Sequence, residues 1–234
     1  MDLLQPAHAH QPLQTSPAPP APREASSTSR KPSIVVALAS LALALAAGAA
    51  IGIGTQVLQG VLPGAWGVLA NSGVMWALGA VLVGLLMPSD RVAVVAGALA
   101  MVTASFSYYA AVEWFEHSAS NGSGAAMWAR AGLLAGPFFA FAGRAVRLGG
   151  TRRWLAVAAF AGTLGAEGAQ LIWFVGVGHL RVAGIVELVV GAALLAASAA
   201  RARGRRRLPL LAPAGIAVAC AVVTLFVLRT LTSW

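Results

Sequence analysis

The chain has 234 residues, of which 59% are hydrophobic and only 10% are charged, and its mean hydropathy is +0.79. A soluble globular domain carries roughly 25% charged residues, so this composition excludes an ordinary soluble protein and indicates an integral membrane protein. The net charge of +9 does not indicate nucleic-acid binding, because the basic residues lie between apolar segments and form no separate basic domain. The single cysteine, Cys220, excludes an intramolecular disulfide and a cysteine-rich metal site.

The N-terminal segment differs in composition from the rest of the chain. Residues 1–32 hold seven of the twelve prolines, together with Ser, Gln and Ala, and such a segment cannot bury a hydrophobic core. We therefore expect a disordered cytoplasmic tail at 1–32, a transmembrane domain at 33–230 and a short external C-terminus at 231–234.

Seven apolar segments follow the tail, most of them near the length of about 20 residues that a helix needs to cross a bilayer. They predict an all-α fold, a polytopic transmembrane helix bundle. The expected spans are Ser33–Leu58, Asn71–Met87, Arg91–Val112, Ala125–Val146, Arg153–Val175, Val182–Ala200 and Pro209–Leu228. The uncharged segment Gly60–Ala70 contains a Pro-Gly turn signal, and it either lies in the membrane interface or re-enters the membrane.

The basic residues predict the orientation of these spans. If the N-terminus is inside, thirteen of the sixteen Lys and Arg residues fall on the inner side, and only Arg130, Arg181 and Arg229 fall outside. Loops on the cytoplasmic side of membrane proteins are enriched in Lys and Arg. We therefore expect seven spans with the N-terminus inside and the C-terminus outside.

One acidic residue lies deep in an apolar span. Glu167 is in the fifth predicted span, and Gln170 lies three residues further on, on the same helical face. A carboxylate at this depth costs a few kcal/mol unless it is paired, hydrated or protonated. No basic residue in a span lies near its depth, so we expect Glu167 to be either protonated by desolvation or reached by water.

Other polar residues lie in the outer halves of the predicted spans, and they too must face the bundle or water. Small and polar residues share helical faces in the first, fifth and sixth spans, and small residues allow close helix approach. In the first span this face consists of Ala44, Gly48, Gly52, Gln56 and Gln59. We therefore expect either a ligand or ion pocket, or a structural cluster that joins the helices. The candidate pocket residues are Glu167, Gln170, Gln56, Gln59, Asn71, Tyr108, Tyr109, Glu187 and Arg130.

Arg130 lies at the outer end of the fourth span. An unpaired charge there is costly, so we expect it to pair with Glu113, Glu116 or Glu187.

Several kinds of chemistry have no matching residues. No predicted span contains histidine, which argues against haem ligation, and the only lysine, Lys31, precedes the first span, which excludes a retinal Schiff base in the seventh. The chain has no metalloprotease, P-loop or dinucleotide-binding motif and no visible nucleophile–base pair. We expect no catalytic, cofactor-binding or metal-binding residue, no cofactor and no enzymatic activity.

Three motifs carry a resemblance. They are the run from Thr55 through Pro63 and Trp66 to Asn71-Ser72-Gly73, then Ser107-Tyr108-Tyr109, and then Ala166-Glu167-Gly168. Over residues 34–230 the chain resembles an uncharacterised family of multi-pass membrane proteins found mainly in actinobacteria. The resemblance implies a bacterial membrane location and no particular activity, substrate or catalytic residue.

Two functional hypotheses follow. The first is a small transporter or permease-like protein of the bacterial plasma membrane, with an outward-facing polar pocket centred on Glu167 that takes a small solute, a proton or a cation. The second is a noncatalytic membrane scaffold or assembly partner whose polar cluster is structural. An intramembrane enzyme ranks third. The lipid bilayer is the expected partner, nucleic acid is not, and the sequence identifies no protein partner.

Overall fold

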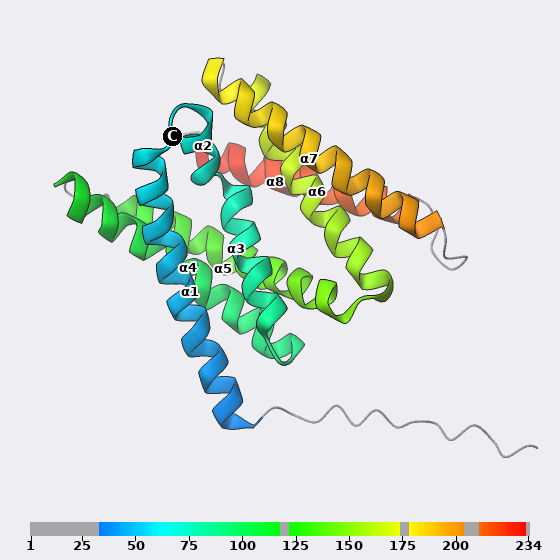
Figure 1. Ribbon diagram of the computed structural model, residues 1–234, viewed down its shortest axis with the longest axis horizontal. Helices are drawn as coiled ribbons and strands as arrows, with labels where there is room; N and C mark the ends of the chain where they lie inside the picture. Colours follow the sequence, from blue (N-terminus) through cyan, green and yellow to red (C-terminus); the bar gives the residue numbers. More distant parts are fainter. Residues whose placement is uncertain (1–32, 118–121, 174–177, 204–210, 233–234) are drawn as a thin grey trace, which may run out of the picture. The chain divides into compact units, whose positions relative to one another are not determined.

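The computed structural model describes residues 33–117, 122–173, 178–203 and 211–232, and within these ranges the chain is helical with no strand (Figure 1). The helices are α1 (Ile34–Val61), α2 (Ala65–Ala70), α3 (Gly73–Leu86), α4 (Asp90–Glu116), α5 (Gly122–Leu148), α6 (Gly150–Trp173), α7 (Gly178–Arg203) and α8 (Leu211–Thr232). The predicted all-α fold is confirmed. The predicted disordered tail lies outside the described residues.

Each of the seven predicted spans coincides with a helix. Among the described residues, five helices are long and apolar enough to cross a membrane, namely α1, α4, α5, α6 and α7, while α3 and α8 contain shorter apolar stretches. The Gly60–Ala70 segment contains the additional short helix α2, preceded by a turn at Gly64 with φ of 52°. The count of seven crossings and the orientation stay predictions.

Small residues bring α1 against α4. The buried face of α1 includes Ala44, Gly48, Gly52 and Gln56, which confirms the predicted stripe of small residues that leads to a polar one. A methyl group added to Gly48 would collide with the Ala100 carbonyl oxygen of α4. The absence of side chains at these glycines therefore allows the two backbones to touch.

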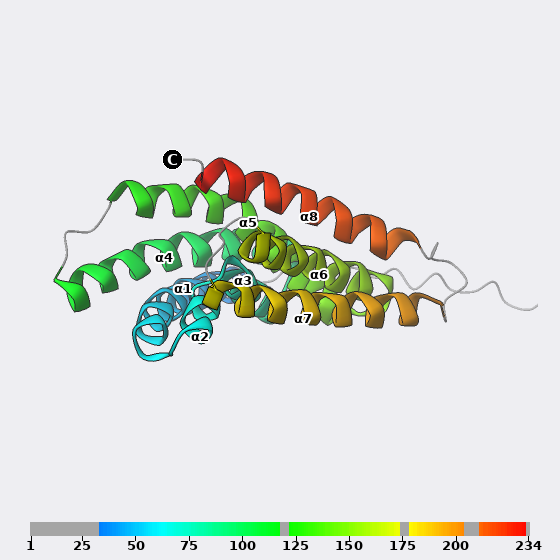
Figure 2. The ribbon, with the colours of Figure 1, turned by 90° about the horizontal axis from the view of Figure 1, so that it is seen from above.

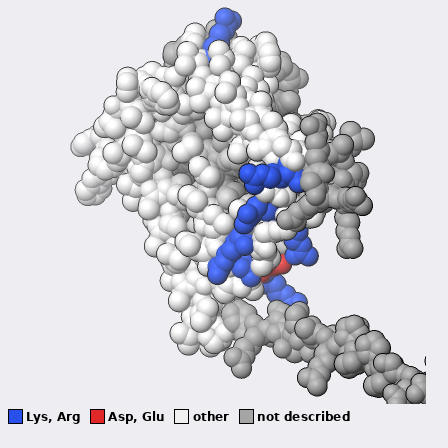
Figure 3. All heavy atoms as spheres, turned by 45° about the vertical axis from the view of Figure 1, so that its right-hand side comes forward, with Lys and Arg blue, Asp and Glu red and all other residues white. Residues whose placement is uncertain are grey.

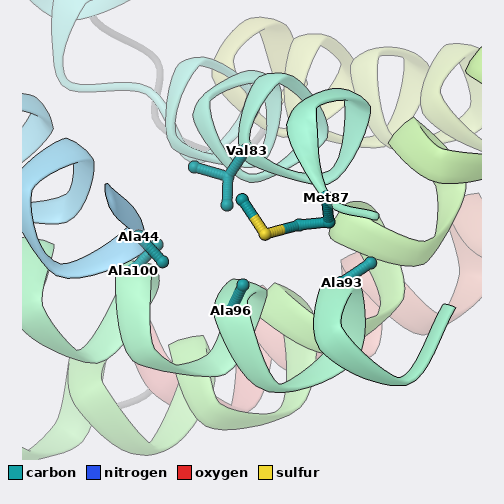
Figure 4. Packing of buried hydrophobic residues seen from close by; sticks show 6 residues of the cluster. All are labelled: Ala44, Val83, Met87, Ala93, Ala96 and Ala100. Atoms are coloured by element: carbon teal, nitrogen blue, oxygen red, sulfur yellow. The ribbon is translucent and has the colours of Figure 1, made fainter. Parts of the chain in front are cut away.

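Similar close contacts hold α3, α4 and α5 together. Gly97 of α4 and Gly136 of α5 face each other's carbonyl oxygens, and Gly84 of α3 lies against the Ala140 carbonyl of α5. One apolar cluster between α1, α3 and α4 consists of fully or almost fully buried side chains (Figure 4). Its members are Ala44, Val83, Met87, Ala93, Ala96 and Ala100. Because most of them are alanines, the helices approach closely with little side-chain volume between them.

The C-terminal helices form a second group in which α6 contacts both α7 and α8 (Figures 1 and 2). Gly168 of α6 and Gly184 of α7 lie against each other's backbone carbonyls, and Gly162 of α6 lies against Ala217 of α8. Helix α6 also contacts α3 and α5, and α2 contacts α7. The two groups of helices therefore meet where α5 contacts α6 and where the α2–α3 segment reaches α6 and α7.

Arginines gather at the C-terminal end of α3. Arg147 of α5 donates hydrogen bonds to the carbonyls of Leu85 (3.1 Å) and Met87 (3.3 Å), and Arg144 lies 3.4 Å from the carboxylate of Asp90. Most Lys and Arg side chains on the face in Figure 3 gather in one region. We call Arg144 and Arg147, at the C-terminal end of α3, the basic end. Arginine is favoured there because the last carbonyls of a helix carry partial negative charge.

Large apolar side chains cover much of the described surface. Ile34, Val35, Leu134 and Trp114 are among them, with exposed fractions of 70% or more. Such a surface is unfavourable in water and suits contact with lipid. Together with the five long apolar helices, it describes a membrane-embedded protein.

Candidate functional site

The candidate site is built around a break between two helices. Helix α2 ends at Ala70 and α3 begins at Gly73, with Asn71 and Ser72 between them. The Ser72 hydroxyl accepts a hydrogen bond from the backbone N–H of Met75 (3.2 Å), as expected for serine at a helix N-cap. The backbone N–H groups of Gly73 and Val74 belong to the first turn of α3, so they have no partner within the helix.

Glu167 of α6 supplies the missing partners. Its Oε1 accepts from the N–H of Gly73 at 2.8 Å, and its Oε2 accepts from the N–H of Val74 at 2.7 Å. Both oxygens are thus held by backbone amides at the positive end of the α3 dipole, an arrangement that favours the charged form of the carboxyl group. The sequence expectation for Glu167, protonation by desolvation or access to water, stays a prediction. The carboxylate is stabilised by backbone amides that the sequence did not identify as partners.

A second carboxyl group lies beside the first. Glu187 of α7 has an exposed fraction of only 2%, and it interacts electrostatically with Glu167. The Ser72 hydroxyl is close to Glu187, but neither oxygen of the Glu187 carboxyl is in hydrogen-bond geometry with a described group. No Arg or Lys in the described ranges forms an ion pair with either residue. We call Glu167 and Glu187 the acid pair.

One more unpaired acceptor lies near the acid pair on α6. The side-chain oxygen of Gln170 is buried and has no hydrogen-bond partner in the described part of the chain. Gln170 is one helical turn from Glu167 on the same face. Buried polar atoms without partners are uncommon, and each calls for an explanation such as a bound proton, ion or water.

The length of α3 gives the depth of the acid pair. This helix has 14 residues, and it runs from Glu167 at its first turn to the basic end at its last. At about 1.5 Å per residue it spans about 21 Å. A bilayer core is about 30 Å thick, and arginines favour its headgroup boundary. If the basic end lies at the headgroup boundary, α3 is therefore long enough to bring the acid pair into the apolar core.

A separate pocket of about 480 Å³ opens between α1 and α4. In it the Tyr108 hydroxyl donates to Oε1 of Gln59 (2.9 Å), and Nε2 of Gln56 donates to Oε1 of Glu116 (2.6 Å). We call it the Tyr108 pocket. Its lining residues are Gln56, Gln59, Gly60, Tyr108, Tyr109, Val112 and Glu116.

The α2–α3 junction connects the Tyr108 pocket to the acid pair. The amide of Asn71 donates to the Tyr108 hydroxyl at 3.3 Å, and two residues later the N–H of Gly73 donates to Glu167. A shift of this junction would therefore change the contacts of both Tyr108 and Glu167. The connection runs through consecutive residues of one short segment.

Tyr108→Phe is expected to lower the free energy of unfolding by about 1 kcal/mol, because the ring stays and only the hydrogen bonds to Asn71 and Gln59 are lost. Unfolding in mixed micelles would measure the change. The double variant with Asn71→Ala should lose less than the sum of the two single losses, and strict additivity would show that the Asn71 contact contributes nothing.

The sequence-predicted pocket residues lie in different places. Both tyrosines and the two glutamines of α1 line the Tyr108 pocket, whereas Glu167, Gln170 and Glu187 do not. Glu167 lies against the first turn of α3, where both of its carboxyl oxygens accept from backbone amides. One sequence prediction is wrong. Arg130 was expected to pair with an acidic residue, but its side chain is exposed and forms no ion pair in the described ranges. An exposed guanidinium keeps its solvation, so it needs no partner.

The most informative groups missed by the sequence reasoning are the amides of Gly73 and Val74. A signal for them was present, because Ser72-Gly73 is a favourable helix start and the second predicted span is short. Glu116 was expected as a possible partner of Arg130, and it accepts instead from the side-chain amide of Gln56.

These features define a membrane-embedded helical protein with a broken helix and a buried pair of carboxyl groups. The chain belongs to a family of unknown function (DUF6518), whose match covers residues 31–232. This confirms the resemblance to an uncharacterised family, while the actinobacterial distribution stays a prediction. No curated protein and no solved structure matches the chain.

Proposed function

We propose that this protein is a small, noncatalytic transporter of the bacterial plasma membrane, in which the acid pair carries a coupling proton or monovalent cation. The observation that carries the proposal is Glu187, whose buried carboxyl oxygens have no hydrogen-bond partner in the described ranges. An uncompensated charge at this depth costs several kcal/mol. A proton or a small cation would remove that cost.

The two carboxyl groups have different hydrogen-bond partners, so we assign them different roles. Glu167 keeps its negative charge on the two amides of α3, so it holds the junction in place. Glu187 faces Glu167 with only the Ser72 hydroxyl nearby and no basic partner in the described ranges, so it is the group that takes up and releases the cation. Discontinuous helices near the middle of the membrane are a recurring site of ion coupling in transporters.

A scaffold is the second candidate, and two observations favour it. Both oxygens of Glu167 are satisfied, and the side chains of the Tyr108 pocket already bond to one another. In a scaffold the same contacts would hold the helices together and no ion would enter. The two candidates differ in whether water reaches the acid pair.

Cysteine labelling at position 170 tests this difference. In a Cys220→Ala background, Gln170→Cys should react with a membrane-impermeant thiol reagent in intact cells if the site opens to water. A cysteine at lipid-exposed Leu134 is the matched negative control, since that side chain is 79% exposed on an apolar surface. Labelling of position 170 only after denaturation would favour the scaffold and contradict the transporter.

Flux into proteoliposomes tests the role of Glu187. We expect a membrane potential to drive proton or Na⁺ uptake by the wild-type protein, and Glu187→Gln to reduce uptake to the rate of empty vesicles. Glu113→Gln removes an exposed carboxylate of α4 and should leave uptake unchanged. If the wild-type protein and Glu187→Gln gave the same uptake, Glu187 would not be the coupling group.

A further inference from the structure

We propose that the Tyr108 pocket binds an organic ammonium cation. This inference rests on the proposed transport function for its biological meaning, and it names the class of solute. The pocket has a volume of about 480 Å³, which is within the range of small-molecule sites. It combines one carboxylate, two side-chain amides and two phenol rings, and no basic residue lines it.

The two tyrosines provide aromatic surface for a cation. The Tyr108 and Tyr109 rings are nearly perpendicular, with an interplanar angle of 86° and centroids 5.3 Å apart. Rings arranged in this way form a corner, and the faces of aromatic rings attract ammonium groups within about 6 Å. Trp76 and Tyr108 also form an edge-to-face pair, with centroids 5.9 Å apart, so packing against Trp76 helps to fix the Tyr108 ring.

Glu116 supplies the charge that selects a cation over a neutral solute. One of its oxygens accepts from Gln56 at 2.6 Å, which fixes the carboxylate at the pocket wall. Asp90 is the only described acidic residue in an ion pair, so no described basic group neutralises Glu116. An anionic solute would meet this carboxylate and no positive side chain, and so it would be rejected.

Neutral polar solutes are the main competitors for this pocket. Amide and phenol groups also suit polyhydroxylated ligands, but the hydrogen-bonding groups here are already paired with one another. A neutral solute would have to break these bonds and replace each of them. A methylated ammonium group needs no hydrogen bond, because ring faces and a nearby carboxylate stabilise it directly.

The same chemistry has two sources, a free solute and the ammonium headgroup of a phospholipid. Calorimetric titration of the purified full-length protein in lipid-free detergent, with choline as the probe, measures binding of the free cation. The matched neutral probe is dimethylbutanol, the alcohol in which a tert-butyl group replaces the trimethylammonium group of choline. It has the shape of choline without the charge. Titration of choline in nanodiscs of phosphatidylethanolamine and of phosphatidylglycerol then separates the two sources.

We expect choline to bind and dimethylbutanol to bind about tenfold more weakly or not at all. Glu116→Gln keeps an oxygen for the Gln56 amide, so the fold should be preserved, and choline binding should weaken about five- to tenfold. The matched variant Glu113→Gln, on the same helix but outside this pocket, should change binding by less than about twofold. Weaker choline binding in phosphatidylethanolamine than in phosphatidylglycerol nanodiscs would identify the headgroup as the resident ligand.

Equal binding of the two probes, equal effects of Glu116→Gln and Glu113→Gln, or no binding of choline in either detergent or nanodiscs would each overturn the inference. Tyr109→Leu removes the aromatic ring and Tyr109→Phe keeps it, so we expect Tyr109→Leu to weaken choline binding more than Tyr109→Phe does. The titrations measure binding alone, so their result does not depend on whether the protein transports ions. Choline binding with no ion uptake would contradict the transport proposal and leave this inference standing. Ion uptake without choline binding would contradict this inference and leave the transport proposal standing.

Discussion

Glu167→Ala is expected to lower the free energy of unfolding by about 3 kcal/mol, because it leaves the N–H groups of Gly73 and Val74 without acceptors inside the bundle. Glu167→Gln should also destabilise the protein, by about 2 kcal/mol, since an amide offers one acceptor where the carboxylate offers two. Reversible unfolding in mixed micelles, followed by tryptophan fluorescence, measures both changes.

Glu187→Gln is the matched control for this experiment. It makes the same chemical change in the other member of the acid pair, but the Glu187 oxygens have no described hydrogen bond to lose. Its effect on the free energy of unfolding should stay within about 1 kcal/mol and could be stabilising, because a buried charge is removed. If the two Gln variants were equally destabilised, Glu167 would not be the structural member of the acid pair.

Gly52→Ala is expected to lower the free energy of unfolding by about 1–3 kcal/mol, although alanine is the better helix former. The added methyl group would meet the Ala104 carbonyl oxygen and would come within 2.8 Å of the Tyr108 backbone nitrogen. Helix α1 would have to move away from α4, and backbone atoms cannot yield as a flexible side chain can. The variant should also weaken ligand binding in the Tyr108 pocket, which both helices line.

Gly54→Ala, two residues along the same helix, is the control. A methyl group there meets nothing within 4 Å, so only helix propensity changes, and the free energy of unfolding should rise by up to about 1 kcal/mol. Thermal unfolding of both variants in the same detergent gives the comparison. A Gly52→Ala protein as stable as Gly54→Ala would mean that the contact between α1 and α4 is loose.

The positions of the helices could be predicted because they depend on local properties of the chain. A run of apolar residues of sufficient length must satisfy its backbone hydrogen bonds internally in lipid, and the α-helix does so within one segment. The predicted spans therefore coincide with helices, including α3, whose shortness was visible in the sequence. The spacing of Gly48, Gly52 and Gln56 likewise indicated which face of α1 is buried.

The candidate site was predictable only in part. Gln59, Asn71 and Tyr108 were expected to meet, and they form one hydrogen-bonded chain. Glu167 and Glu187 were identified because carboxyl groups are rare in apolar spans, but their different environments were not foreseeable. Gly73 and Glu167 are 94 residues apart, and the Glu167 side chain bonds to the backbone amide of Gly73, a group that almost every residue has. Residue types can indicate a helix start with free amides, as Ser72-Gly73 does, but they do not indicate which distant side chain will accept from those amides.

For this protein, the sequence alone determined membrane embedding, the helical class and the rarity of its intramembrane acids, because these follow from composition and local periodicity. Only the tertiary structure decided which acid is satisfied and which is not. It set the first turn of α3 against Glu167 and left Glu187 without a hydrogen-bond partner in the described ranges. The physical reason is that hydrogen-bond satisfaction depends on where distant helices cross, and that crossing is set by the close packing of glycines on both sides.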